Sequence, residues 1–193
     1  MTGGPSSENE LIRRARGGDE EAFAELVMLH ADRVRGALRR FGLDANEAEE
    51  VAQEVFLRAW RGLARFEGRA QFSTWLYRIA FNEAQRRLSR RPPPRADTDP
   101  DRDDPIVSLP ESPTLGPEAQ TLDHEFEQKL EWALEQLPME WRAAVVLRDI
   151  EGLSTREAAE IVGVREAAFK SRLHRGRMQL RALLEPYLRL EEG

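Results

Sequence analysis

The sequence has 193 residues, 40% of them hydrophobic, and a formal net charge of −6; it contains no cysteine, which excludes disulfides and thiolate metal sites. Its three histidines, His30, His124 and His174, lie too far apart in the sequence to suggest a local metal site, and we expect no metal and no cofactor. No apolar run approaches the roughly 18 residues that a membrane span needs, and the first residues lack the order of a signal peptide, so we expect a cytoplasmic protein without direct membrane insertion.

The first half of the chain has the apolar spacing of helices and no convincing strand alternation. A short amphipathic segment around Leu11 is interrupted by Gly17 and Gly18. Asp19 then caps a second helix, which ends near Phe41.

Two further helices are predicted in the same half. Asp44 and Glu47 have the spacing of a capping box and open a third helix. Gly68 breaks it, and a fourth helix begins at Phe72 and ends in arginines, which the helix dipole favours at a C-terminus. We expect these helices to form one domain over residues 8–91, after a disordered N-terminus at residues 1–7.

A flexible linker is predicted at residues 92–117. This stretch concentrates proline and acidic residues, lacks apolar periodicity and cannot propagate a helix or a central strand. Arginines crowd the flanking segments, residues 78–91 and 165–181, so the negative net charge hides two basic regions separated by an acidic spacer.

Residues 118–188 are predicted to form a second helical domain, followed by a tail at residues 189–193. Its first two helices are expected to stop at Pro138 and at Gly152. Together the two halves predict an all-α protein of two small helical domains joined by a Pro-rich acidic linker.

The end of the second domain has helix-turn-helix spacing. A capping box at Ser154–Glu157 opens a short helix over residues 155–162, and Gly163 supplies the turn before a longer helix from about residue 166 to residue 184. Ala159 and Phe169 fall where the two helices cross. The longer helix carries donors for phosphates and base edges: Lys170, Ser171, Arg172, His174, Arg175 and Arg177. This segment predicts DNA binding, whereas an ordinary helical hairpin is the simpler alternative.

Aromatic residues and arginines interleave between residues 65 and 87. The combination suits the stacking of unpaired bases while the nucleic-acid backbone is neutralised. Taken alone, the same residues fit a packed core with a solvated basic face better.

Two parts of the chain resemble conserved regions of the extracytoplasmic-function (ECF) sigma factors, group 4 of the sigma-70 family of RNA polymerase sigma factors. The segments Glu50-Val-Ala-Gln-Glu-Val-Phe-Leu-Arg-Ala-Trp60 and Phe72-Ser-Thr-Trp-Leu-Tyr-Arg-Ile-Ala-Phe-Asn82 are similar to regions 2.2 to 2.4 of that family. The segments Leu153-Ser-Thr-Arg-Glu-Ala-Ala and Lys170-Ser-Arg-Leu-His-Arg-Gly-Arg177 resemble its region 4, in the same order.

The resemblance implies a non-enzymatic sigma factor that binds core RNA polymerase and directs promoter recognition, −10 melting and transcription initiation. The residues that it implies in contact with the coiled coil of the polymerase β′ subunit are Glu50, Gln53, Glu54 and Trp60. Those implied at the −10 element are Phe66, Arg69, Phe72, Arg78, Asn82 and Arg86. Those implied at the −35 element are Arg156 and Arg165, on phosphates, with Lys170, Ser171, Arg172, His174 and Arg175. It also implies a contact with the polymerase β flap and a cognate anti-sigma factor.

Three positions depart from the usual family pattern. Glu50 stands where Asp is commoner, and the negative charge is kept, so binding to core polymerase is not put in doubt. Ala168 stands where Thr is frequent and Phe169 where Val is frequent. The preferred −35 sequence therefore does not follow from the resemblance.

The main alternative is an autonomous helix-turn-helix transcriptional regulator, which binds a symmetric DNA site without polymerase. A second alternative is a sigma-like decoy that sequesters an anti-sigma factor, but the basic residues in both DNA-facing segments count against it. An enzyme is the weakest alternative, because neighbouring acids such as Glu49 and Glu50 diverge on a helix and no nucleophile–base pair is evident.

Overall fold

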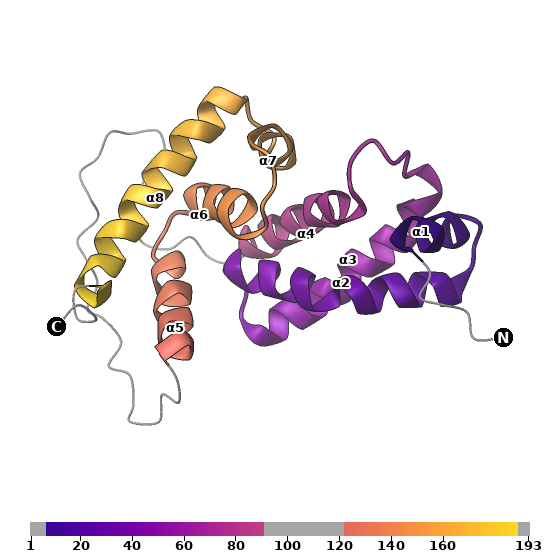
Figure 1. The fold of residues 1–193 in the computed structure, drawn as a ribbon, viewed down its shortest axis with the longest axis horizontal. Coiled ribbons are helices and arrows are strands. Elements are labelled where there is room, and N and C mark those ends of the chain that lie inside the picture. Colours follow the sequence, from indigo (N-terminus) through magenta and orange to yellow (C-terminus); the bar gives the residue numbers. More distant parts are fainter. Residues whose placement is uncertain (1–6, 91–121, 189–193) are drawn as a thin grey trace. The chain divides into compact units, whose positions relative to one another are not determined.

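The computed structural model describes residues 7–90 and 122–188, and every regular element within them is a helix (Figure 1). The chain divides into two compact units, Met1–Pro92 and Pro93–Gly193. The prediction of an all-α fold with two small helical domains is confirmed. The predicted linker at residues 92–117 lies outside the described residues, as do residues 1–6 and 189–193.

The described part of the first unit contains the four predicted helices and one short 3₁₀ turn. These elements are α1 (Glu8–Arg16), α2 (Glu20–Arg40), α3 (Ala45–Gly62), the turn η1 (Leu63–Arg65) and α4 (Phe72–Leu88). The long helix α2 packs against α1, α3 and α4, and α3 also packs against α4 (Figure 1). This packing leaves one side of α3 and one side of α4 facing solvent.

Both predicted helix caps of the first unit are confirmed. Asp19 Oδ1 accepts a hydrogen bond from the amide of Ala22 at 3.0 Å, which satisfies a free amide at the start of α2. This hydrogen bond, together with the neighbouring Arg14, lowers the pKa of Asp19. Asp44 Oδ1 accepts from the amide of Glu47 at 2.9 Å, and Glu47 Oε2 accepts from the amide of Asp44 at 3.3 Å, completing the capping box of α3.

Apolar faces of the helices form the core of the first unit. Leu26 of α2, Val55 of α3 and Leu76 of α4 are almost fully buried. Phe41 and Phe81 meet edge to face, with ring centroids 5.6 Å apart. Because burial of each large apolar side chain contributes about 1.5–3 kcal/mol, this core holds the solvent-facing sides of α3 and α4 on a fixed frame.

The second unit contains four α-helices and a π-helical turn within its described residues. These elements are α5 (Leu122–Glu135), α6 (Met139–Val145), the π-turn η2 (Val146–Ile150), α7 (Thr155–Val162) and α8 (Glu166–Leu188). Helix α8 packs against α5, α6 and α7 (Figure 1). The predicted helix ending near Gly152 is present, but its last turn is wider than an α-helical turn, because the amide of Glu151 donates to the carbonyl of Val146 at 2.9 Å.

Two close contacts fix α6 against its neighbours. Arg142 Nη2 donates to the carbonyls of Glu135 and Leu137 at 2.6 and 3.0 Å, which satisfies free acceptors at the C-terminus of α5. Gly176 of α8 lies so near α6 that a Cβ there would come within 2.8 Å of Val145 Cγ2 and 3.0 Å of the Trp141 carbonyl oxygen. The approach of α8 to α6 therefore requires glycine at position 176.

Candidate functional site

A groove of about 560 Å³ opens between α2 and α3. Its apolar lining comes from both helices: Phe23, Val27, Ala31, Ala52, Phe56, Leu57 and Trp60. Phe23 packs on Trp60 with ring centroids 4.9 Å apart, whereas Leu57 remains 49% exposed. A concave surface that leaves large apolar side chains in water is typical of a binding site.

Two of the four residues predicted to contact polymerase line this α2–α3 groove. Gln53 is exposed at its edge, and Trp60 is half-buried in its wall. The other two, Glu50 and Glu54, lie on α3 outside the lining and are both ion-paired. Glu50 pairs with Arg87 of α4 at 2.8 Å, and Glu54 pairs with an arginine of its own helix.

The α2 side of the groove was not singled out by the sequence analysis, which placed every predicted contact with the β′ coiled coil on α3. Leu26 and His30 point into the core, while Phe23, Val27 and Ala31 form a second row, four residues apart, along the groove. The signal was present in the sequence as two parallel apolar rows on one helix. Only the packing shows which of the two rows remains open to a partner.

Two aromatic residues predicted at the −10 element flank the loop between η1 and α4, Phe66 after η1 and Phe72 at the start of α4, and their rings pack inward. Phe66 is 8% exposed and Phe72 is 2% exposed. Both rings contact Trp75, with centroids 5.1 and 5.7 Å apart. Gly68, with a φ of +71°, turns the chain between them. In this conformation the two rings hold the base of the loop and offer little surface to a DNA base.

The other residues predicted at the −10 element lie at the surface. Arg69 extends from the loop and pairs with Glu67 at 2.6 Å. Arg78, Asn82 and Arg86 recur every fourth residue along α4 and are all exposed, which places them on one side of the helix, the α4 face.

The turn between α7 and α8 has the predicted helix-turn-helix geometry. Gly163 has a φ of +73°, in the left-handed region that glycine adopts without steric cost. The amide of Val164 donates to the carbonyl of Ala159 at 3.0 Å and closes α7. Ala159 and Phe169 are both buried, as the close crossing of two helices requires. Helix α8 is thus held at a fixed angle to α7.

Most residues predicted at the −35 element are exposed: Lys170, Ser171 and His174 on α8, Arg156 on α7 and Arg165 in the turn. Arg172 and Arg175 are half-buried. Lys170, Ser171 and His174 define the α8 face. Exposed side chains of this kind can donate to phosphates and base edges.

Arg177, one of the α8 donors predicted for DNA, is exposed but pairs with Asp149. Its Nε and Nη2 donate to Asp149 Oδ2 and Oδ1 at 2.9 and 2.6 Å. The hydrogen bonds and the charge of Asp149 raise the pKa of Arg177. Because Asp149 belongs to the π-turn η2, this pair fastens α8 to that turn.

His30 is a buried titratable group next to the first residue of α4. Its Nε2 lies 3.3 Å from Glu8 Oε1, and its ring meets Phe72 edge to face with centroids 5.3 Å apart. Burial lowers the pKa of His30, although the carboxylate of Glu8 opposes this change. The neutral imidazole is therefore favoured at neutral pH.

The candidate functional residues lie on three separate surfaces: the α2–α3 groove and the α4 face in the first unit, and the α8 face in the second. Within residues 7–90 and 122–188, no group of three or more His, Asp or Glu side chains is placed to hold a metal ion. No helix in the part of the chain that the structure describes is long and apolar enough to cross a membrane.

Two parts of the chain match known protein families, in the order in which these surfaces occur along the sequence. Residues 26–92 match Sigma-70 region 2, and residues 127–180 match Sigma-70, region 4. The RNA polymerase sigma-H factor of Pseudomonas aeruginosa is 37% identical over 189 residues, which cover 94% of this chain and 96% of that protein. The ECF RNA polymerase sigma-E factor of Haemophilus influenzae is 32% identical over 185 residues, covering 94% and 97%. The chain belongs to the ECF sigma factors of the sigma-70 family.

A solved structure agrees with this assignment. The sigma factor RpoE of Bartonella quintana, crystallised with the anti-sigma factor NepR, is 26% identical with a TM-score of 0.63, and the match covers 84% of this chain and 96% of that one. As an ECF sigma factor, the protein binds core RNA polymerase and promoter DNA and directs transcription initiation. Its region 2 match contains all of α3 and α4, and its region 4 match contains every residue predicted at the −35 element. The family predicted from the motifs is confirmed.

Proposed function

We propose that the α2–α3 groove and the adjoining surface of α3 dock on the coiled coil of the β′ subunit. The observation that carries this proposal is that Gln53 and Trp60, chosen from the sequence as polymerase contacts, both line an open apolar groove. Glu50 and Glu54, on the same helix, form ion pairs with Arg87 and Arg58 and so supply charged groups beside it. An apolar centre with a charged rim is the usual anatomy of a protein interface.

The α4 face and the loop before it recognise and melt the −10 element in this proposal. Arg69, Arg78, Asn82 and Arg86 contact the DNA directly. Phe66 and Phe72 support the loop from inside, and they reach a base only if the loop opens. Capture of a flipped base costs a few kcal/mol of unstacking, least when the DNA is already melted by the polymerase complex.

The second domain, residues 118–188, reads the −35 element. Lys170, Ser171 and His174 enter the major groove with Arg172 and Arg175 beside them. Arg156 and Arg165 hold phosphates. Each good bidentate base contact discriminates by about 1–3 kcal/mol, and the same domain rests on the polymerase β flap.

The first domain, residues 8–91, and the second domain act in the cytoplasm as parts of a polymerase holoenzyme, with no catalytic activity of their own. The reaction belongs to the polymerase. A cognate anti-sigma factor covers the polymerase-docking surface until the sigma factor is needed. The complex of the Bartonella sigma factor with NepR supports the existence of an anti-sigma partner.

Reconstitution with core RNA polymerase tests the proposed function. We expect co-elution with core polymerase and run-off transcripts from a subset of genomic promoter fragments. The double variant Gln53→Ala/Trp60→Ala should lose both, because it removes the polar edge and the aromatic wall of the groove. The matched control Met28→Ala/Asn46→Ala truncates exposed side chains of the same two helices outside the groove and should retain both.

A stable protein that binds a symmetric DNA site without core polymerase and starts no transcripts would contradict the proposal. That result would favour the autonomous helix-turn-helix regulator.

A further inference from the structure

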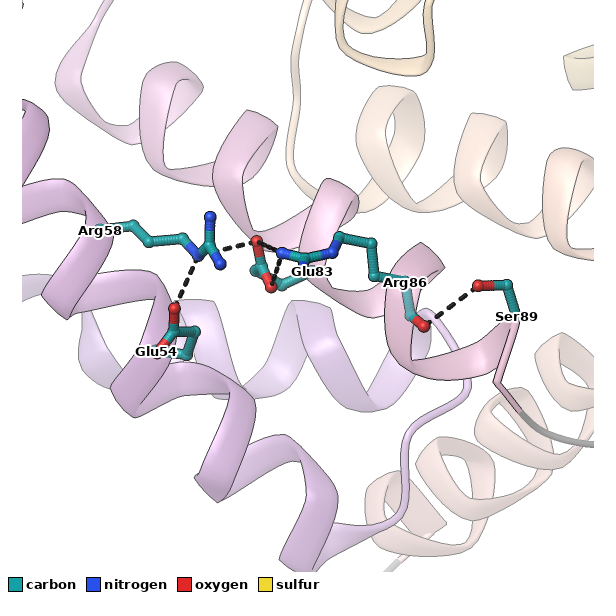
Figure 2. A network of polar contacts seen from close by, with 5 residues as sticks. All are labelled: Glu54, Arg58, Glu83, Arg86 and Ser89. Atoms are coloured by element: carbon teal, nitrogen blue, oxygen red, sulfur yellow. Dashed lines mark hydrogen bonds and ion pairs between the residues drawn. The ribbon is translucent and has the colours of Figure 1, made fainter.

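A chain of ion pairs joins α3 to α4 (Figure 2). Arg58 Nε of α3 lies between Glu54 Oε1, at 2.8 Å, and Glu83 Oε1 of α4, at 3.0 Å. On the other side of Glu83, Arg86 Nη1 donates to both carboxylate oxygens at 3.1 and 3.0 Å. Glu83 is therefore the carboxylate shared by two arginines (Figure 2).

Burial makes Glu83 the fixed member of this chain. Its side chain is 12% exposed, whereas those of Arg58 and Arg86 are 42% and 52% exposed. A shielded carboxylate is stable only when it is paired and hydrogen-bonded, so both arginines are held to it. The long arginine side chains extend from this anchor toward solvent.

The geometry leaves Arg86 able to bind DNA while it is held. Glu83 contacts only Nη1 of Arg86, and a guanidinium group has five N–H donors. Among the residues that the structure describes, Nε and Nη2 have no side-chain partner, so this edge can donate to a phosphate or a base. Asn82, the other predicted −10 residue on this turn, is next to Glu83 in the sequence.

We propose that Glu83 is a positioning residue for −10 recognition, which acts through Arg86. It fixes the direction of the guanidinium group beside Asn82, and it cancels part of the positive charge of the α4 face. Arg86 thereby favours promoter DNA over DNA of other sequence. A donor held in a fixed direction can select one acceptor position, whereas a freely rotating cation binds any nearby phosphate. This inference rests on the proposed −10 role of α4.

A second bridge between the same helices supplies a matched control. Arg87 of α4 pairs with Glu47 at 3.2 Å and with Glu50 at 2.8 Å. Glu47 is 16% exposed, close to the value for Glu83, and its partner Arg87 is not among the residues predicted to bind DNA. Glu47→Gln removes the same charge from an α3–α4 bridge, and glutamine still completes a capping box.

The experiment uses the reconstituted holoenzyme and a promoter fragment identified by run-off transcription, with a mixed-sequence duplex of equal length as competitor. Dissociation constants are measured over a range of salt for the wild type, Glu83→Gln, Arg86→Gln, the double variant and Glu47→Gln. We expect Glu83→Gln to lower the preference for the promoter by about fivefold, within the range of coupling between neighbouring residues. Its binding to mixed-sequence DNA should tighten and become more salt-dependent, with a log–log slope steeper by about 0.9.

The double variant tests whether Glu83 acts through Arg86. In the Arg86→Gln background, Glu83→Gln should change neither the preference nor the slope, and Glu47→Gln should match the wild type. The inference is overturned if Glu83→Gln leaves the preference unchanged, lowers it equally in both backgrounds, or is matched by Glu47→Gln. A wild-type holoenzyme without any promoter preference would instead overturn the proposed function.

If Glu83→Gln does not fold, a conservative variant can test the proposal instead. Glu83→Asp keeps the charge but is one methylene shorter, so it cannot keep the orientation of Arg86. We expect a lower promoter preference with an unchanged salt slope, because Glu83→Asp loses the orientation of Arg86 but keeps the negative charge. An unchanged preference in this variant would count against the positioning role.

Discussion

The two helices that we propose to face DNA, α4 and α8, carry their positive charge in different ways. On α4, Arg86 is paired with Glu83 of its own helix, and Arg87 is paired across to α3. On α8, Lys170 makes no ion pair within the described residues, while Arg177 is tied to Asp149.

The difference matches two kinds of DNA contact. A partly neutralised face with fixed donors suits a few bases of a melted strand, where position matters more than charge. An exposed cation on a recognition helix suits the phosphates and base edges of a duplex. The four predictions below test this comparison, from the largest expected effect to the smallest.

Phe169→Ala should give the largest difference between the DNA-binding roles proposed for α4 and α8. Phe169 is fully buried at the crossing of α7 and α8, so its truncation should cost about 3–5 kcal/mol and abolish −35 binding. Binding to core polymerase through the first unit should persist. The control is Phe126→Ala on α5, which removes a ring that is already 38% exposed and should change stability by less than about 0.5 kcal/mol. If thermal unfolding showed the same loss of stability for Phe169→Ala and Phe126→Ala, the buried ring at the crossing would stabilise the unit no more than an exposed ring.

Gly176→Ala should destabilise the second unit by about 1–3 kcal/mol, because its Cβ would overlap Val145 and the backbone of α6. Gly36→Ala on α2 is the matched control. Its nearest neighbour is the flexible end of the Arg40 side chain at 3.1 Å, and alanine favours the helix, so stability should be unchanged or slightly higher. Urea unfolding measures both, and a neutral Gly176→Ala variant would mean that α8 can shift away from α6.

Lys170→Ala and Arg177→Gln should have opposite signatures. Lys170→Ala should reduce the salt slope of −35 binding by about 0.9, with no change in melting temperature. Arg177→Gln should keep the slope and lower stability by about 0.2–1 kcal/mol, a value suited to a pair in which Arg177 is 55% exposed. A reduced slope for Arg177→Gln would show that Arg177 contacts DNA despite its pair with Asp149.

The smallest effect concerns His30, in the first unit. Its pKa is lowered in the fold by burial, while the unfolded residue titrates near pH 6.5, so below about pH 6.5 the unfolded state binds more protons and stability falls. Glu8 opposes the shift and Arg33 adds to it. His30→Gln should therefore flatten the decline in urea stability between about pH 7 and pH 5, and Glu8→Gln should steepen it. An identical pH profile for wild type and His30→Gln would rule out this source of acid sensitivity.

Local sequence determined the helices, their caps and the helix-turn-helix. The capping box of Asp44 with Glu47 joins residues three apart, and the turn at Gly163 depends on one residue's freedom to adopt a positive φ. Gln53 and Trp60 were singled out by the family resemblance rather than by spacing, and both line the α2–α3 groove.

Only the tertiary structure decided how the charged and aromatic side chains pair. Asp149 and Arg177 are 28 residues apart, and Glu47 and Arg87 are 40 apart, so no periodicity links them. The inward packing of Phe66 and Phe72, and the choice of Glu83 as anchor for Arg58 and Arg86, likewise depend on how α3 and α4 meet. The physical reason is that helix formation follows from neighbours in sequence, whereas burial and ion pairing follow from neighbours in space.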